Sequence, residues 1–227
     1  MSIEKLKNTM LDIYDKISKN KVVADVVLVG ATKTRSIEIV EDAVRAGLTV
    51  AGENRVQELL SKYKVIEGLS WHFIGALQTN KVKYIVDKVD MIHSLDRIEL
   101  ATEINKRCKK IGKIMPVLVE VNIGGELSKT GVKPEDLFEF VDQIKSFPNI
   151  RIEGLMSVLP KFADDGLYSR MAVLFDELKQ KFPELPIRWL SMGMSNDFEK
   201  ALNHGANMIR LGSMLFGERC YAQSIEV

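Results

Sequence analysis

The chain has 227 residues, of which 46% are hydrophobic and 28% charged, a composition typical of a soluble globular protein. Its 32 lysines and arginines against 31 aspartates and glutamates give a net charge of +1, which argues against a basic nucleic-acid-binding surface. The apolar runs are strand-sized, residues 1–5 lack an apolar signal segment, and Cys108 and Cys220 form no CxxC motif. We therefore expect a cytoplasmic protein with no membrane span and no nucleic-acid partner.

The N-terminal region predicts an amphipathic helix over residues 2–19. Ser2 is a suitable cap. Apolar residues follow at three- and four-residue steps and share one face, namely Ile3, Leu6, Met10, Ile13 and Ile17. This helix precedes the first predicted strand, so we expect it to be additional to the repeating units that follow.

Eight short apolar runs follow, separated by segments with helical periodicity. The first, residues 26–32, is continuous and apolar, as in strands that are buried on both faces of a parallel sheet. Ser36 then marks a helix start and Gly47 its end, with Val40 and Val44 on the core face. The other seven runs are residues 48–52, 71–75, 91–95, 116–122, 152–158, 189–194 and 208–213.

Eight strand–helix units predict an α/β chain folded as a single closed (β/α)8 barrel of the TIM type. The units span about residues 26–217, and no linker rich in Pro, Gly or Ser interrupts them, so we expect one domain over residues 1–227. The alternative is a doubly wound open sheet, which the same alternation of strands and helices also produces.

In such a barrel the functional residues lie at the C-terminal ends of the strands. The polar and glycine residues at these ends are Lys33, Glu53, Asn54, Arg55, Gly75, Asp96, Asn122, Ser157, Ser195, Asn196, Gly212 and Ser213. An amine among amides, hydroxyls and glycines suits an anionic ligand that carries a carbonyl group. The histidines, His72, His93 and His204, match no ligand spacing such as HExxH, so we predict no metal site.

Lys33 directly follows the first strand, which would hold it at the mouth of the barrel. A lone lysine is usually a solvated surface charge. Partial burial at the barrel mouth would lower the pKa of the amine and make it available for imine formation. Its place in the fold therefore favours a functional role.

The ends of the last two strands predict a phosphate-binding seat, because barrels often bind phosphate in the loops after strands 7 and 8. The segment Ser195-Asn196-Asp197 would open a helix, whose N-terminus presents unpaired N–H groups. Gly212 would let the backbone approach a ligand closely, and Ser213 adds a hydroxyl. Arg210 shares a face with Gly212 and, if buried, requires an acceptor. The alternative is that Ser195 is only a cap and Gly212 only a turn.

Nine segments carry a resemblance to a known family: 28–33, 52–58, 71–81, 121–122, 128–131, 154–156, 191–197, 209–213 and 216–218. Together they resemble the pyridoxal 5'-phosphate (PLP) homeostasis protein family, of the YggS/PROSC type, whose barrel is similar to the N-terminal domain of alanine racemase. The family more often has Ala-Val-Ser where this chain has Gly30-Ala31-Thr32, and often threonine at Ser213. Neither departure affects Lys33.

The resemblance implies PLP bound covalently, as an internal aldimine on Lys33. It implies that the other cofactor-binding residues are Asn54, Met156, Ser157, Ser195, Arg210, Gly212 and Ser213. Within this set, Ser195, Gly212 and Ser213 would hold the phosphate, and Arg210 would donate to the pyridine nitrogen. Asn54 would lie close to the ring, and Met156 and Ser157 would line the pocket.

Lys129, in the loop Ser128–Gly131, is a candidate for a second PLP site, with a solvated loop lysine as the alternative. The resemblance implies a carrier that stores, buffers or delivers PLP, without catalytic residues, and apo-forms of PLP enzymes as candidate partners. An arginine at the pyridine nitrogen keeps that nitrogen unprotonated and weakens the electron sink. Alanine-racemase-like enzymes tolerate this weaker sink, but they also use a second, β-rich domain that contributes a tyrosine base, and we expect no room for that domain before Val227.

Without that domain we expect a monomer or weak dimer. Two alternatives remain open at this point. One is a PLP-dependent amino-acid racemase-like enzyme of low activity. The other is an aldolase-type barrel that forms a Schiff base with a phosphorylated sugar.

Overall fold

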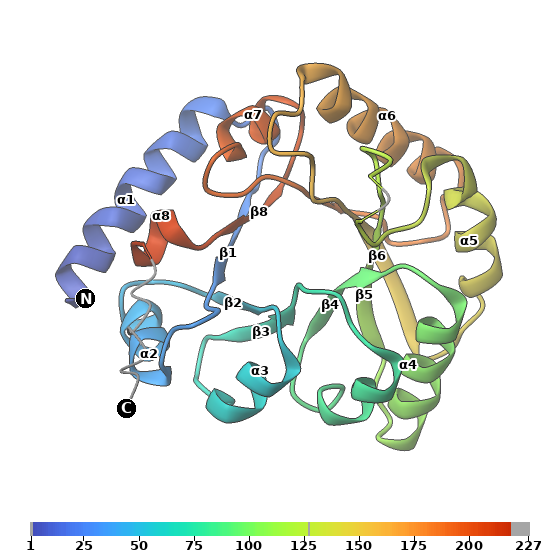
Figure 1. Cartoon of the computed structure of the whole chain (residues 1–227), viewed down its shortest axis with the longest axis horizontal. Coiled ribbons are helices and arrows are strands. Elements are labelled where there is room, and N and C mark those ends of the chain that lie inside the picture. The colour runs from blue at the N-terminus through green and yellow to red at the C-terminus, as the bar shows by residue number, and fades with distance from the viewer. Residues whose placement is uncertain (1, 127, 219–227) are drawn as a thin grey trace, which may run out of the picture.

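The computed structural model describes residues 2–126 and 128–218, and its strands form a closed parallel barrel in the order β1 to β8 (Figure 1). The strands are β1 Val27–Ala31, β2 Val50–Glu53, β3 Ser70–Phe73, β4 Met91–Leu95, β5 Met115–Glu120, β6 Ile150–Met156, β7 Trp189–Ser191 and β8 Met208–Leu211. β8 pairs with β1 over four residue pairs, from Val27 with Met208 to Gly30 with Leu211. The predicted closed barrel is confirmed, and the open sheet is wrong because an open sheet leaves its first and last strands unpaired with each other.

Helices surround the barrel and cover its outer face (Figure 1). They are α1 Ile3–Asn20, α2 Ile37–Arg45, α3 Val56–Lys62, α4 Ile98–Lys110, α5 Leu137–Ile144, α6 Asp165–Lys181, α7 Phe198–Asn203 and α8 Ser213–Phe216, with 3-10 helices η1 Thr79–Tyr84 and η2 Pro134–Asp136. The predicted N-terminal helix is confirmed as α1, and the Ser2 hydroxyl caps it by accepting a hydrogen bond from the Lys5 N–H at 3.2 Å.

α1 packs over the junction where the first and last strands meet. Its buried residues, including Leu6 and Ile13, belong to one apolar cluster with Leu28 of β1 and Ile209 of β8. An amphipathic helix with one apolar stripe can bury it only against another apolar surface. α1 therefore completes the cover at the closing strand pair, in addition to the helices that follow the strands.

The alternation of side chains along the strands sends one set inward and determines what lies at the barrel mouth. Val29 and Ala31 of β1, Val50 of β2 and Met208 of β8 belong to an interior apolar cluster. Polar residues continue the same alternation, with Lys33 two positions after Ala31 and Arg210 two positions after Met208. In β1 and β8 the sequence order thus places apolar residues in the interior and a basic residue two positions nearer the C-terminal end of the barrel.

Candidate functional site

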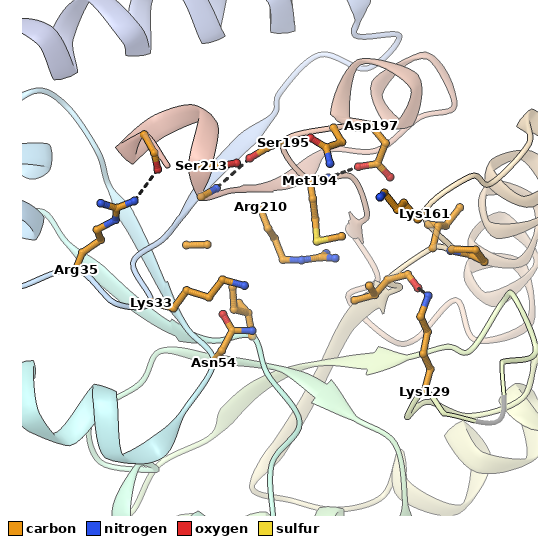
Figure 2. A pocket seen from close by; sticks show the side chains of 18 residues that line it. Lys33, Arg35, Asn54, Lys129, Lys161, Met194, Ser195, Asp197, Arg210 and Ser213 are labelled. Carbon is orange, nitrogen blue, oxygen red and sulfur yellow. Dashed lines mark hydrogen bonds between the residues drawn. The ribbon is translucent and has the colours of Figure 1, made fainter. Parts of the chain in front are cut away.

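A cavity of about 480 Å³ lies at the C-terminal ends of the strands (Figure 2). The residues that line it are Ala31, Lys33, Arg35, Asn54, Ile74, Lys129, Val158, Leu159, Pro160, Lys161, Met194, Ser195, Asn196, Asp197, Arg210, Gly212, Ser213 and Gly217. Six of the eight predicted site residues are among them. Only Met156 and Ser157 are not.

The turn that carries Lys33 is held in place from α3. The backbone of Thr34 has a φ of 63°, and its N–H donates to the carboxylate of Glu58 at 2.8 Å. On the other side, the ammonium of Lys62 donates to the carbonyl oxygens of Thr32 at 2.9 Å and Arg35 at 2.8 Å. These contacts fix the backbone on both sides of Lys33, whose side chain reaches into the cavity (Figure 2).

The ammonium of Lys62 also pairs with Glu53, at 2.8 Å, and both side chains are buried. The Thr32 hydroxyl donates to the same carboxylate. Burial raises the pKa of Glu53, and the contacts with Lys62 and Thr32 oppose this effect. The ion pair thus links the end of β2 to the Lys33 turn.

Arg210 lies at the floor of the cavity with 4% of its surface exposed. Its guanidinium donates to the carbonyl oxygen and the hydroxyl of Ser191, at 2.9 and 2.7 Å, and to the carbonyl oxygen of Ser157, at 2.9 Å. The sequence predicted that a buried arginine here would need acceptors, and these groups supply them. Burial lowers the pKa of Arg210 to about 10. In the described part of the chain its direct partners are neutral, so the floor of the cavity is cationic.

Met156 and Ser157, which were expected to line the pocket, are not among the residues of the cavity wall, and both are buried with 1% exposure. β6 ends at Met156, and the Ser157 hydroxyl donates to the carbonyl oxygen of Val121 at 2.8 Å. Ser157 affects the cavity through its carbonyl group, which holds Arg210. The next residue, Val158, is the one that reaches the wall.

Ser195 joins the loop after β7 to the loop after β8. Its hydroxyl oxygen accepts from the N–H groups of Gly212 and Met214, both at 3.3 Å. The helix predicted to follow Ser195-Asn196-Asp197 is α7, which begins at Phe198 with Asp197 in the cap position, so Ser195 lies two residues before the cap. The two loops expected to form a phosphate seat nevertheless meet at this hydroxyl.

Cations dominate the charged side chains of the cavity wall. Lys33, Arg35, Lys129, Lys161 and Arg210 line it, against one carboxylate, Asp197. Arg35 and Lys161 were not among the predicted site residues, because lysines and arginines in loops usually belong to the solvated surface. Arg35 lies two residues after Lys33 on the same turn, and this position in the sequence could have indicated that it belongs to the site.

Lys129 is not a solvated loop lysine. Its ammonium donates to the carbonyl oxygen of Val158 at 3.2 Å and pairs with Glu126, and its side chain is 28% exposed (Figure 2). The loop after β5 therefore closes one side of the cavity with a second lysine, across from Lys33. This surplus of positive charge suits a ligand with a phosphate group.

The comparisons with known proteins agree with this geometry. Residues 2–220 match the family model described as alanine racemase, N-terminal domain. The pyridoxal phosphate homeostasis protein of Aquifex aeolicus is 46% identical over 200 residues, which cover 86% of this chain and 87% of that protein. This chain belongs to the pyridoxal phosphate homeostasis protein family.

Solved structures extend the likeness to the fold. PipY of Synechococcus elongatus PCC7942, solved with PLP bound, has a TM-score of 0.83 at 29% identity, over 93% of this chain and 100% of that chain. Alanine racemase of Clostridium difficile 630 has a TM-score of 0.73 at 16% identity, over 96% of this chain and 57% of that chain. The second likeness bears on the fold alone.

Two histidines lie in the barrel interior beneath Arg210. His72 Nδ1 is 2.9 Å from His93 Nε2, and His93 Nδ1 is 3.5 Å from the Ser191 hydroxyl that Arg210 also contacts. Burial lowers the pKa of His72 to about 4 and holds that of His93 well below its usual value. Both are therefore neutral at physiological pH and serve as hydrogen-bonding core residues.

The described residues contain no group of three or more His, Cys, Asp or Glu side chains placed to hold a metal ion. None of the helices within residues 2–126 and 128–218 has the length and apolar character needed to cross a membrane. Cys108 is a buried free thiol, and Cys220 lies outside the described residues.

Proposed function

We propose that this protein binds PLP as a Schiff base on Lys33 and acts as a carrier in intracellular PLP homeostasis. The observation that carries the proposal is the meeting of three groups in one cavity: the Lys33 amine, the Ser195–Gly212 contact and the buried Arg210 guanidinium. Relatives named for PLP homeostasis, and the PLP-bound PipY structure, support the same ligand.

The residues present fit PLP by the chemistry of their groups. Lys33 supplies the amine that bonds to the cofactor's aldehyde carbon. The hydroxyls of Ser195 and Ser213 would supply donors for the phosphate, and Gly212 would let it approach the backbone closely. The surplus of cations on the wall would offset its charge. Asn54 would lie beside the ring, with Met156 and Ser157 supporting the pocket from beneath.

Arg210 would face the pyridine nitrogen. Its contacts with Ser191 and Ser157 hold the guanidinium in one orientation. When bound, PLP supplies an electron sink for carbanions next to an amine nitrogen. A guanidinium keeps its proton, so Arg210 would leave the ring nitrogen unprotonated and weaken that sink. This property suits a carrier better than an enzyme that uses carbanion chemistry.

We also propose that residues 1–227 act as one cytoplasmic PLP-binding domain, as a monomer or weak dimer. It would hold no catalytic residue of its own. Apo-forms of PLP enzymes are the proposed recipients of the cofactor. Lys129 on the cavity wall is a candidate for a second lysine that contacts PLP.

The test is the visible spectrum of the purified protein loaded with PLP, followed by borohydride reduction and peptide mapping. We expect a cofactor absorption band and a pyridoxyl label on Lys33, both lost in Lys33→Ala. Labelling mainly at Lys129 or Lys81 would contradict the proposal. Exchange of the α-proton of added amino acids in deuterated buffer separates the two functions: a carrier exchanges very slowly, whereas fast exchange with racemised product would favour the racemase-like enzyme.

A further inference from the structure

The turn that presents Lys33 has an unusual backbone conformation. The Arg35 N–H donates to the carbonyl oxygen of Thr32 at 3.0 Å, which closes a tight turn with Lys33 and Thr34 in its two central positions. Thr34 has a φ of 63° and is the one residue other than glycine with a positive φ in the described part of the chain. Turns that need such a φ usually carry glycine or asparagine at that position. A threonine is disfavoured there, because its branched Cβ crowds the backbone.

The contacts that hold this turn come from α3. A strained backbone persists only where its surroundings hold it, and such residues gather at functional sites. The carboxylate of Glu58 accepts from the Thr34 N–H at 2.8 Å. The ammonium of Lys62, four residues further along α3, donates to the carbonyl oxygens of Thr32 at 2.9 Å and Arg35 at 2.8 Å. Residues four apart share one face of a helix, so both side chains reach the turn from the same side of α3.

Glu58 and Lys62 differ in what depends on them. Lys62 is buried and uses its three N–H donors on two carbonyl oxygens and Glu53, so its loss would leave a buried charge without a partner. The side chain of Glu58 is 25% exposed, and its ion pair with the exposed Arg55, at 4.0 Å, contributes little to stability. The contact with Thr34 is therefore the main role of Glu58, and Glu58 can be changed without unfolding the barrel.

We propose that Glu58 is a positioning residue for the covalent step at Lys33. It holds Thr34 in the left-handed conformation, and the turn then directs the Lys33 amine into the cavity (Figure 2). This inference rests on the proposed binding of PLP at Lys33. In that step Lys33 Nζ bonds to the aldehyde carbon, and the aldehyde oxygen leaves as water with the two protons of the neutral amine. Such a step depends on orientation, since a misplacement of about 1 Å can slow a reaction about 100-fold.

The proposal separates bond formation from phosphate-dependent binding. The phosphate seat proposed at Ser195 and Ser213 lies in the loops after β7 and β8, whereas the Lys33 turn follows β1 and is held from α3. A change at Glu58 should therefore slow bond formation and leave phosphate-dependent binding unaltered. Pyridoxine 5'-phosphate has the ring and phosphate of PLP but an alcohol in place of the aldehyde. Its affinity measures the second property alone.

The experiment mixes cofactor-free protein with saturating PLP and follows formation of the bond at Lys33 by stopped-flow absorption. In Glu58→Leu, and in Glu58→Ala as a second variant, we expect bond formation to be at least tenfold slower, because the amine is no longer oriented. Affinity for pyridoxine 5'-phosphate should stay within about threefold. Glu58→Gln keeps an oxygen that can accept from the Thr34 N–H and should restore the rate. Gln57→Leu, which alters the adjacent exposed residue of α3, should leave both measurements unchanged.

An unchanged rate of bond formation in both Glu58→Leu and Glu58→Ala would overturn the proposal. An equal loss of rate and of pyridoxine 5'-phosphate affinity would do the same, because it would show that Glu58 supports the whole cavity rather than the Lys33 turn.

A further substitution separates positioning from charge. A negative charge beside the turn favours the protonated form of a nearby amine, so a purely electrostatic role predicts faster bond formation in Glu58→Leu. Positioning predicts slower formation. Glycine adopts a positive φ without steric cost, so Thr34→Gly added to Glu58→Leu should restore most of the lost rate. Failure of the double variant to recover would contradict the positioning role.

Amide hydrogen exchange of Thr34 in the cofactor-free protein tests the contact without PLP. Its N–H should exchange at least tenfold more slowly in the unmodified protein than in Glu58→Leu, because the carboxylate accepts from it. Equal exchange would overturn the proposal. Slow exchange in a protein that forms no bond at Lys33 would refute the proposed PLP binding, and the positioning role with it, while the contact itself stands. A bond at Lys33 that forms equally fast without Glu58 would refute the positioning role alone.

Discussion

The side-chain nitrogen of Lys62 lies 2.9 Å from the carbonyl oxygen of Thr32, the residue directly before Lys33. The same nitrogen lies 2.8 Å from the carboxylate of Glu53. One buried ammonium therefore ties three segments together: α3, the end of β2 and the turn that presents Lys33. The sequence alone indicates that Lys62 lies on the surface of a helix. In the structure it is buried and holds the turn of the candidate site in place.

Lys62→Met should lower the free energy of unfolding by about 3–5 kcal/mol, because it leaves the buried charge of Glu53 without its partner. Urea denaturation measures this change. Lys64→Met is the control, since Lys64 pairs with Glu41 at the surface with 62% of its side chain exposed, and an exposed pair contributes about 0–1 kcal/mol. The double variant Lys62→Met/Glu53→Leu should recover most of the loss. Equal losses in Lys62→Met and Lys64→Met would show that the buried pair is unimportant.

The buried histidines predict a loss of stability in mild acid. The pKa of His72 is about 4 in the folded protein, against 6.5 in an unfolded chain. Below pH 6.5 the unfolded chain takes up a proton that the folded protein does not. The contribution of His72 to the free energy of unfolding is therefore fully present above pH 6.5 and is lost as the pH falls toward 4. The full loss is about 3.5 kcal/mol, from a pKa difference of about 2.5 at about 1.4 kcal/mol for each unit.

His72→Gln isolates this effect, because glutamine cannot titrate and can still form a hydrogen bond with His93. Urea denaturation at several values between pH 7.5 and 4.5 should show a smaller loss of stability in the variant. Glu53 and Glu120 act in the opposite direction, since their raised pKa values favour the folded state on acidification. Both carboxyls are retained in the variant. Their effect on stability therefore cancels when the pH profile of the variant is subtracted from that of the unmodified protein. Identical pH profiles would mean that His72 is not held neutral.

The barrel could be predicted from the sequence because it depends on periodicity. Six of the residues that line the cavity, among them Lys33 and Arg210, could be predicted because they lie at or near the ends of strands. The residue at which a strand ends is harder to predict from the sequence than the existence of the strand. The apolar run 152–158 predicts a strand through Val158, but β6 stops at Met156, and Val158 is the residue of this segment that lines the cavity. A register shift between Val117 and Leu118 of the adjacent β5 also interrupts the alternation on which such an assignment depends.

Capping residues are ambiguous in a similar way. Ser195, Asn196 and Asp197 are all suitable helix caps, so residue type alone does not distinguish them. In the structure Asp197 has that position, but its carboxylate makes no hydrogen bond to α7. It accepts instead from the Met194 N–H at 2.7 Å and from the Tyr168 hydroxyl at 2.7 Å. The Tyr168 contact comes from α6 and depends on tertiary packing. Long-range partners of this kind, like Lys62 for the Lys33 turn, leave no local trace in the sequence.

Ser195→Ala combined with Ser213→Ala should weaken PLP binding more than tenfold, since hydrogen bonds to a charged group contribute about 1.5–3 kcal/mol each. Spectroscopic titration with PLP and with pyridoxal, which lacks the phosphate, measures the effect. The unmodified protein should prefer PLP strongly, and the double variant should lose most of that preference. Each single variant serves as a partial control. Equal affinity of the unmodified protein for both compounds would mean that these serines do not hold a phosphate.

Gly212→Ala separates what the fold requires from what a ligand requires. A Cβ at residue 212 would meet only Ala31, at 3.6 Å, which is ordinary van der Waals contact, and the backbone φ of −112° is open to any residue. The protein should therefore fold with unchanged or slightly higher stability, because alanine lowers the entropy of the unfolded chain. Since Ala31 and Gly212 both line the cavity, the added methyl group would occupy space proposed for the phosphate.

We expect PLP affinity to fall at least tenfold in Gly212→Ala, measured by absorption titration, while the thermal midpoint does not fall. Gly75→Ala is the contrasting control. A Cβ there would lie 2.3 Å from the carbonyl oxygen of Asn54, so this variant should lose stability as well as affinity. A Gly212→Ala protein that binds PLP normally would show that the phosphate does not approach this part of the backbone. The glycine would then be a simple turn residue, and the phosphate seat would have to be sought nearer to Arg35 and Lys161.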